Sequence, residues 1–413
     1  MNSYNKKTCR LCYSTALSYK FGLTKTAPAN NLLLEANLKG LEYDLDIYQC
    51  KDCGHIQLGF VVDPHLLYDS YVYTSGISSS FVDYLDEYAK DVVNKYNITE
   101  DDYIVEIASN DGTFLNSFKK QNITAIGVDP AKKLAKEATS KGLVTIGDMY
   151  GYAANNQILG MCGNKKPKVI VANNVFAHID ELTETFLAIN KLLDKNGVLI
   201  FEVGYFVDVF VKGLFDTIYH EHLSYHTIKP LVTFLSKFSM EIFDIKRTES
   251  QGGTIRVSCQ FKYKDKPYPI SDSVLKLIKY EHELKLYNND TLIKYYDKIE
   301  NIKKELHYLL HSIKNKTVAI YGAPAKATTL LTHFNITNYI DYIVDDNILK
   351  QGLYIPGTDL RIYDPIKLQY EPPDYVLILA WNFAESIMDK LEHKYNFIIP
   401  IPTVRMVSKV EEI

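Results

Sequence analysis

The sequence lacks three features, and each absence argues against one class of protein. It has no apolar run long enough to cross a bilayer, which argues against an integral membrane protein. Its formal net charge is −4, and no lysine cluster is interleaved with aromatic residues, which argues against a nucleic-acid-binding protein. Nothing at residues 1–7 resembles a signal peptide, so we expect a cytoplasmic protein whose thiols stay reduced.

The remaining composition is that of a folded, soluble protein. Hydrophobic residues make up 46% of the chain and charged residues 23%. With 413 residues the chain is too long for one ordinary core, so we expect two or three domains.

Four of the six cysteines form two matched CxxC pairs, which in a reducing compartment indicate metal binding rather than disulfides. Two such pairs bring four thiolates to the corners of a tetrahedron, the arrangement that Zn²⁺ takes in closed structural sites. Gly54 follows the second pair and suits the turn that lets backbone amides point at the sulfurs. A chance match or a redox pair would not account for both pairs. We therefore expect a structural zinc in a decorated zinc ribbon, with the ligands Cys9, Cys12, Cys50 and Cys53.

A strand, a turn of small residues and a helix start follow one another at about 102–115. A second short strand ends in Asp129, where doubly wound folds place an acid against ribose hydroxyls. The GxGxxG motif of dinucleotide enzymes is absent, so the turn better suits S-adenosylmethionine, which has no pyrophosphate. The expected cofactor contacts in these segments are Glu106, Ala108, Asn110, Asp111, Gly112 and Asp129.

Two further strands are expected at about 169–173 and 198–203. The first ends in Asn173 and Asn174, at the crevice where a doubly wound sheet binds its ligand, so both are expected cofactor contacts. His178 follows this polar patch. A lone histidine is more often structural, but this position makes an active-site role an equally good interpretation.

The densest group of acid–base side chains lies at 215–226, which holds three imidazoles, two carboxylates and two phenols. Such groups are costly to bury unless they perform chemistry. Histidine titrates near neutral pH, and a phenol can donate to a developing oxyanion. We interpret this segment as the catalytic part of an enzyme that removes a proton from carbon.

A second nucleotide-binding unit is expected in the C-terminal third. A stretch with helical periodicity at about 273–314 leads to a strand, a turn and a helix at 317–330. Small residues and a lysine at a helix N-terminus are a natural phosphate position, a later strand ends in acids, and another ends in the chain's only tryptophan. A purely structural α/β domain is the alternative. The expected nucleoside-diphosphate contacts are Gly322, Lys326, Asp345, Lys350, Trp381 and Asn382.

In their order and spacing, these motifs resemble the sugar C-methyltransferases of deoxysugar pathways, the family of the tetronitrose and mycarose C-3 methyltransferases. The resemblance covers nearly the whole chain. Besides the four cysteines, it rests on residues 71–76, 106–112, 173–178, 216–222, 252–254, 322–326 and 380–383. The chain departs from the family pattern at Ala108 and Ala327, where glycine is common.

The resemblance implies an α/β protein of three domains. These are a zinc-binding domain (1–68), a Rossmann-like S-adenosylmethionine-dependent methyltransferase domain (69–262) and a second Rossmann-like domain that binds the nucleotide sugar (263–413). It also implies that His222 is the general base, that Glu221 and Tyr219 support it, and that Tyr73 and His178 lie around the reacting sugar. A monomer is favoured.

The implied substrate is a nucleotide-linked 4-keto-6-deoxy sugar, methylated at C3. A 4-keto group acidifies the hydrogen on C3, so a histidine can remove it and polar donors can stabilise the enolate. Three alternatives remain at this point. They are O- or N-methyl transfer to a related small molecule, an RNA-modifying or RNA-binding protein, which the acidic balance disfavours, and a non-catalytic nucleotide-sugar-binding protein.

Overall fold

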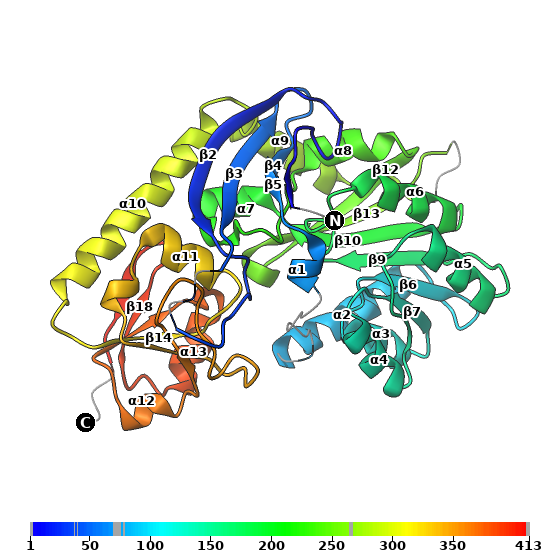
Figure 1. Ribbon diagram of the computed structural model, residues 1–413. Coiled ribbons are helices and arrows are strands. Elements are labelled where there is room, and N and C mark those ends of the chain that lie inside the picture. The colour runs from blue at the N-terminus through cyan, green and yellow to red at the C-terminus, as the bar shows by residue number, and fades with distance from the viewer. Residues whose placement is uncertain are drawn as a thin grey trace.

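The computed structural model describes residues 3–36, 38, 40–68, 76, 79–263 and 267–409, which fold around three large β-sheets (Figure 1). The central sheet has seven strands in the order β12-β13-β10-β9-β6-β7-β8. Six of them run in the same direction, whereas β13 is antiparallel to both of its neighbours. The strands are β6 (Tyr103–Ile107), β7 (Thr124–Val128), β8 (Val144–Ile146), β9 (Val169–Asn173), β10 (Val198–Gly204), β12 (Met240–Thr248) and β13 (Thr254–Phe261).

Helices cover both faces of this sheet because alternate strand residues point to opposite sides. Ile170 of β9 and Leu199 of β10 belong to the same apolar cluster as Phe186, whereas Val171 and Ile200 belong to a second cluster with helix α2. The helices of this part are α2 (Ser79–Lys95), α3 (Thr113–Lys119), α4 (Lys132–Ser140), α5 (Tyr152–Met161), α6 (Leu182–Leu192), α7 (Phe206–Lys212) and α8 (Ile228–Ser236), with the 3-10 turns η2 (Phe215–Thr217) and η3 (Ser250–Gly252).

The N-terminal sheet has the order β11-β4-β3-β2, and its edge strand β11 (Ser224–Tyr225) comes from the middle of the sequence. The N-terminal part thus shares a sheet with the segment expected to be catalytic. Its elements are β1 (Tyr4–Asn5), β2 (Leu17–Thr26), β3 (Tyr43–Cys50), β4 (Ile56–Leu58), β5 (Phe60–Val61) and α1 (Pro64–Tyr68).

The C-terminal sheet has six strands in the order β16-β15-β14-β17-β18-β19, all parallel except β19. The two Rossmann-like units expected from the sequence are therefore present. The C-terminal elements are β14 (Val318–Tyr321), α11 (Ala327–Phe334), η4 (Thr337–Tyr339), β15 (Tyr342–Val344), β16 (Ile362–Tyr363), α12 (Lys367–Tyr370), β17 (Tyr375–Ile378), η5 (Trp381–Phe383), α13 (Ala384–Lys390), β18 (Asn396–Ile399) and β19 (Arg405–Val407).

The helical stretch expected at about 273–314 consists of two helices, α9 (Asp272–Glu283) and α10 (Thr291–Ser312). The break between them contains Lys285, with a left-handed φ of 53°, and then the weak helix formers of 288–290. Helix α9 packs on α8 and β12, whereas α10 packs on β2, where the rings of Phe21 and Tyr296 stack 5.3 Å apart. Figure 1 shows α10 running from the N-terminal sheet down to the C-terminal unit.

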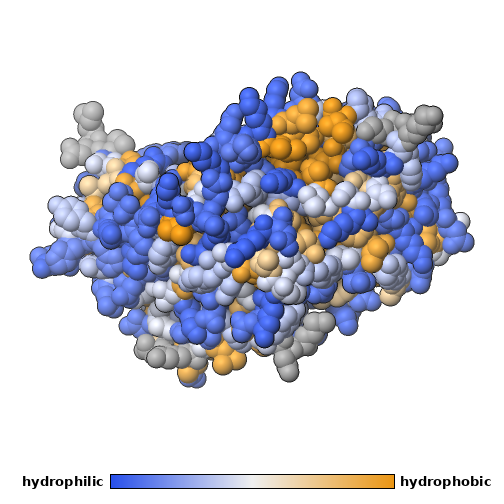
Figure 2. Space-filling model, turned by 90° about the horizontal axis from the view of Figure 1, so that it is seen from above, coloured by the Kyte–Doolittle hydropathy of each residue, from blue (hydrophilic) through white to orange (hydrophobic). Residues whose placement is uncertain are grey.

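In the part of the chain that the structure describes, no helix is both long and apolar enough to cross a membrane. Seen from above, the surface is mainly hydrophilic, with one conspicuous patch of apolar residues (Figure 2).

Candidate active site

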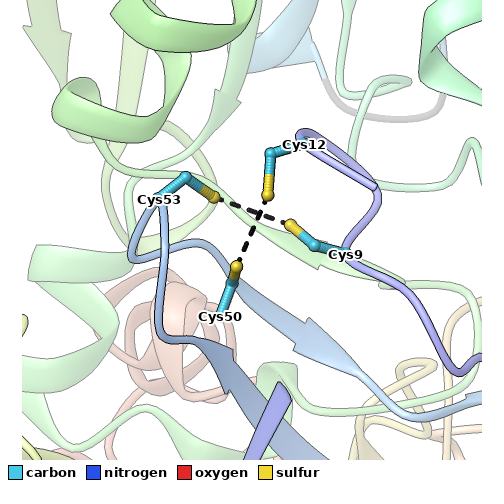
Figure 3. Close-up of side chains that lie close together, drawn as sticks. All are labelled: Cys9, Cys12, Cys50 and Cys53. Carbon is cyan, nitrogen blue, oxygen red and sulfur yellow. Dashed lines mark hydrogen bonds between the residues drawn. The ribbon is translucent and has the colours of Figure 1, made fainter. Parts of the chain in front are cut away.

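The four cysteines of the two CxxC pairs converge on one point (Figure 3). All four sulfurs lie within 4.8 Å of one another. The Sγ atoms of Cys9 and Cys53 are 3.6 Å apart, and those of Cys12 and Cys50 are 3.5 Å apart. Tetrahedral Zn²⁺ with bonds of about 2.3 Å requires sulfur separations of about 3.8 Å, so these residues fit zinc. Gly54 has a φ of +82°, which confirms the turn expected after the second pair.

The turn after β6 has the shape of a cofactor loop. Its backbone is left-handed at Ala108 (φ 58°), Asn110 (φ 51°) and Gly112 (φ 79°). Asp129, at the end of β7, accepts hydrogen bonds from the backbone N–H groups of Asn110 at 2.7 Å and Ala131 at 2.8 Å. The expected acid therefore lies directly against the expected turn.

Several buried polar atoms beside this turn have no hydrogen-bond partner among the described residues. They are Oε2 of Glu106, Oγ of Ser109 and Nδ2 of Asn173. Burial raises the pKa of Glu106 well above its usual value, and the charges of Asp129 and Asp111 raise it further. Polar atoms buried without a partner are costly, and a polar cofactor with amino and hydroxyl groups would satisfy them, so the site fits S-adenosylmethionine.

The remaining expected cofactor contacts have structural partners around the same crevice. Asp111 accepts a hydrogen bond from the N–H of Gly76 at 2.9 Å. Asn173 Oδ1 accepts one from the hydroxyl of Tyr88 at 3.3 Å. The N–H of Asn174 donates to the carbonyl of Glu202 at 2.7 Å, which fixes the start of the loop that carries His178.

The catalytic segment brings His222, Tyr219 and His178 together. His222 Nδ1 lies 2.7 Å from the carbonyl oxygen of Thr217, and its Nε2 lies 2.9 Å from the hydroxyl of Tyr219. The rings of His178 and His222 are 5.0 Å apart and nearly perpendicular, at 86°. Burial lowers the pKa of His222 to about 4, and burial together with His222 lowers that of His178 to about 3. Both imidazoles are therefore neutral at pH 7.

The other acid–base groups of the segment contact the N-terminal part. His220 Nε2 lies 3.3 Å from the carbonyl oxygen of Tyr43. Burial raises the pKa of Glu221 to about 7, against a smaller lowering by a hydrogen bond with Asn30. Glu221 forms its hydrogen bond with Asn30, and its expected support of His222 stays a prediction. Tyr73, expected near the sugar, lies outside the described residues, as does the rest of 71–75.

The six expected substrate contacts fall into two groups. Around the turn after β14, Gly322 is left-handed (φ 90°), Asp345 accepts a hydrogen bond from the N–H of Ala323 at 2.6 Å, and Lys350 Nζ donates to the carbonyl of Ala323 at 2.7 Å. This turn repeats the geometry of the Ala108 turn and Asp129, because in both an acid after the second strand accepts a backbone N–H from the turn.

The second group surrounds Asp216 of the catalytic segment, which is fully buried. Trp381 Nε1 donates to Asp216 Oδ2 at 2.6 Å, and Lys326 Nζ lies 3.8 Å from the same oxygen. Lys326 also lies over the Trp381 ring at 3.8 Å and donates to Asn382 Oδ1 at 3.0 Å. These three side chains thus join the C-terminal unit to the catalytic segment. The sequence did not reveal this role of Asp216, because its partners are distant in sequence. The one available indication was that an acid stands beside the histidines.

Three protein-family models match successive parts of the chain. The model described as "Putative zinc binding domain" matches residues 9–68, "Methyltransferase domain" matches residues 81–240, and "C-methyltransferase C-terminal domain" matches residues 249–402. Their order is the order of the three structural units described above.

A curated relative matches nearly the whole chain. C-methyltransferase NovU of Streptomyces niveus is 29% identical over 409 residues, which are 97% of this chain and 96% of NovU.

Solved methyltransferase structures match only part of the chain. Magnesium protoporphyrin IX methyltransferase of Synechocystis PCC 6803 is 12% identical, with a TM-score of 0.34, over 44% of this chain and 83% of its own. An S-adenosylmethionine-dependent methyltransferase of Clostridium acetobutylicum ATCC 824 is 15% identical, with a TM-score of 0.35, over 44% of this chain and 92% of its own.

The comparisons support the sugar C-methyltransferase resemblance seen in the motifs, and they favour C-methyl transfer over the RNA-binding, non-catalytic and O- or N-methyl-transfer alternatives. Over nearly its whole length the chain is similar to C-methyltransferases, and these matches show an S-adenosylmethionine-dependent C-methyltransferase whose N-terminal part carries a four-cysteine zinc site.

Proposed function

We propose that this enzyme methylates C3 of a nucleotide-linked 4-keto-6-deoxy sugar, and that His222 is the base that removes the C3 proton. The observation that carries this proposal is the hydrogen bonding of His222. A backbone carbonyl can only accept, so Nδ1 must hold the proton that is donated to Thr217. The lone pair of the neutral ring is therefore on Nε2, where the hydroxyl of Tyr219 donates to it.

This arrangement suits proton abstraction from carbon. The Thr217 carbonyl holds the imidazole in one tautomer and one orientation, and the low pKa keeps it unprotonated at neutral pH. As the C3–H bond breaks, the proton passes to Nε2 and its electron pair enters an enolate on the sugar. For this the Tyr219 hydroxyl turns from Nε2 to the sugar, which frees the Nε2 lone pair for the C3 proton. Tyr219 or His178 then donates to the enolate oxygen. Tyr73 is proposed as a further residue around the sugar.

When bound, S-adenosylmethionine supplies an electrophilic methyl group on a positively charged sulfur. Transfer of this methyl group to C3 is the chemistry that the cofactor would supply. Glu106 and Asp129 would hold the cofactor beside the crevice, with Asn173 and Asn174 on the neighbouring strand. Zinc takes no part in this chemistry, because four thiolates leave no open coordination position.

The C-terminal unit is proposed to bind the nucleotide part of the substrate at the turn after β14. Asp345 and Lys350 there provide an acid and a cation around a left-handed glycine, Gly322. Lys326, Trp381 and Asn382 are also proposed for this contact, but each has a protein partner near Asp216.

The proposal is tested by mass spectrometry of the enzyme with S-adenosylmethionine and a panel of nucleotide-linked 4-keto-6-deoxyhexoses. We expect a gain of one methyl group on a keto sugar. His222→Gln should lower the rate at least about 100-fold, the usual contribution of a positioned base, with cofactor affinity retained. His307→Gln is the control, because His307 lies in α10 and bonds the carbonyl of Phe334. Turnover retained by His222→Gln would remove His222 from this role.

A further inference from the structure

The loop that carries His178 is held by the N-terminal part through one carboxylate, Asp180. Its oxygens accept hydrogen bonds from Tyr4, from Lys6 at 2.9 Å and from Arg10 at 2.8 Å. Burial alone would raise the pKa of Asp180, but Arg10 and the other two partners lower it overall. The side chain two residues after His178 is therefore an ionised anchor.

Arg10 lies inside the first CxxC pair, between Cys9 and Cys12. Only 1% of its surface is exposed, and its Nη1 donates to the carbonyl of Leu58 at 2.7 Å. A buried guanidinium needs a fixed anionic partner, so its position and that of Asp180 depend on each other. The first zinc-binding pair is thereby connected to the loop of His178.

The second CxxC pair leads to the segment that follows His222. His55 Nε2 lies 3.2 Å from the hydroxyl of Ser224. Strand β4, directly after His55, pairs with β11, and the N–H of Leu58 donates to the carbonyl of Leu223 at 3.0 Å. The residue after His222 is therefore bonded to a strand that begins three residues after Cys53.

These two catalytic segments also join each other directly. The carbonyl of Ala177 accepts hydrogen bonds from the N–H of Leu223 at 2.8 Å and from that of Ser224 at 3.1 Å. Ala177 precedes His178, and Leu223 follows His222. The two rings, 5.0 Å apart, therefore lie beside backbone hydrogen bonds that join their segments. The zinc-binding part contacts each of these segments as well.

We propose that the N-terminal part positions the two active-site histidines, with Arg10 and Asp180 fixing His178 and with His55, Ser224 and β4 fixing His222. The four thiolate ligands share one metal site, so they fix the two CxxC pairs relative to each other. Both connections are fixed with them. The cofactor turn after β6 is held by Asp129 at the end of β7 instead, so this turn does not depend on the contacts that hold the histidines.

This inference rests on the proposed role of His222 and goes beyond it. It assigns Asp180 and Ser224 as positioning residues, which act through the two histidines rather than on the substrate. A purely stabilising role for these contacts predicts a lower unfolding temperature with an unchanged active site in the folded fraction. A positioning role predicts folded, zinc-loaded protein in which proton abstraction is impaired and cofactor binding is not.

The test compares Asp180→Asn and Ser224→Ala with Lys237→Met as the control. Lys237 also connects the first pair to the central unit, through a bond to the carbonyl of Leu11 at 2.7 Å and a position over the Tyr13 ring. Zinc content and S-adenosylmethionine affinity are measured first, and both should match the wild type. Deuterium uptake from solvent into each keto sugar of the panel, without cofactor, then measures proton abstraction alone.

We expect deuterium uptake to fall at least about tenfold in Asp180→Asn, because small displacements of a reacting group are costly, and to fall less in Ser224→Ala. The ¹⁵N signals of the His178 and His222 imidazoles, which need no substrate, should move in both variants and stay in place in Lys237→Met. Unchanged deuterium uptake and unchanged imidazole signals would overturn the inference. If Asp180→Asn does not fold, the result for Ser224→Ala is the test. Shifted signals with no uptake even in the wild type would support positioning and reject the proposed base.

Discussion

At the scale of single residues, burial in the proposed active site disfavours the charged forms of ionisable groups. Burial lowers the pKa values of His178 and His222 and raises that of Glu221, so each shift disfavours the charged state. For a base, a low pKa ensures that the imidazole is free to accept a proton but gives it little intrinsic basicity. The enolate must therefore be stabilised by nearby donors, which is the role proposed for Tyr219 and His178.

Glu221 should make the protein less stable as the pH rises. Its pKa is about 7 in the folded protein and about 4.5 in an unfolded chain, so the folded state binds the proton more tightly. The stabilisation is complete below pH ~4.5 and is lost as the pH rises through 7, a change on the order of 3 kcal/mol. Glu221→Gln should remove this part of the pH dependence.

Urea unfolding of wild type and Glu221→Gln at pH 5 and pH 8 measures this effect. The buried histidines act in the opposite direction, since their contribution is lost as the pH falls from 6.5, but they are common to both proteins and cancel in the difference. Parallel pH profiles for the two proteins would contradict the assignment.

Ala108 and Ala327 should respond oppositely to glycine, although the family pattern has glycine at both positions. Ala108 has a left-handed backbone, which costs a non-glycine residue about 1 kcal/mol, so Ala108→Gly should be neutral or stabilising by up to about 1 kcal/mol. Ala327 begins helix α11, where glycine costs up to about 1 kcal/mol. Thermal unfolding of the two variants compares them, and a larger loss for Ala108→Gly would show that its backbone is not strained.

At the scale of elements, helix α2 is fixed to the central sheet by a buried network. Arg256 of β13 donates to Glu202 of β10 at 3.2 Å and lies over the ring of Tyr88. Tyr84 of α2 donates to the same carboxylate at 2.5 Å, and Tyr88 donates to Asn173. The network therefore ends at Asn173, one of the proposed cofactor contacts, and it sets the position of α2 on the sheet.

Elements and motifs that depend on neighbouring residues were predictable from the sequence. The two CxxC pairs and the turn at 108–112 carry their information within a few residues, and their positions were found. Long-range pairs were not, because Asp216 and Trp381 are 165 residues apart and Arg10 and Asp180 are 170 apart. Nothing in either local sequence indicates which distant charge or indole will face it. The break between α9 and α10 was readable in principle, since residues 288–290 are weak helix formers.

At the scale of the whole molecule, the Asp216 contacts should matter for stability because they join two units through a buried charge. Lys326→Met would leave the Asp216 carboxylate buried without its cation, which costs about 3–5 kcal/mol. Adding Asp216→Asn to this variant removes the uncompensated charge and should recover most of the loss. Denaturant unfolding of the single and double variants measures both effects.

Lys316→Met is the matched control, because Lys316 forms an exposed pair with Asp374 and should cost at most about 1 kcal/mol. A double variant as unstable as Lys326→Met alone would mean that Lys326 acts through packing on Trp381 rather than through the charge of Asp216.

Strand β11 has a consequence for how the chain acquires its structure during synthesis. The N-terminal sheet includes Ser224 and Tyr225, so it cannot be completed when residues 3–68 leave the ribosome. Until then β4 is an open sheet edge, and its pairing has to wait for the closure of a long loop that contains most of the central sheet. The N-terminal sheet, although most of it is made before the central sheet, is therefore among the last parts to be finished, and the proposed active site forms in that same late step.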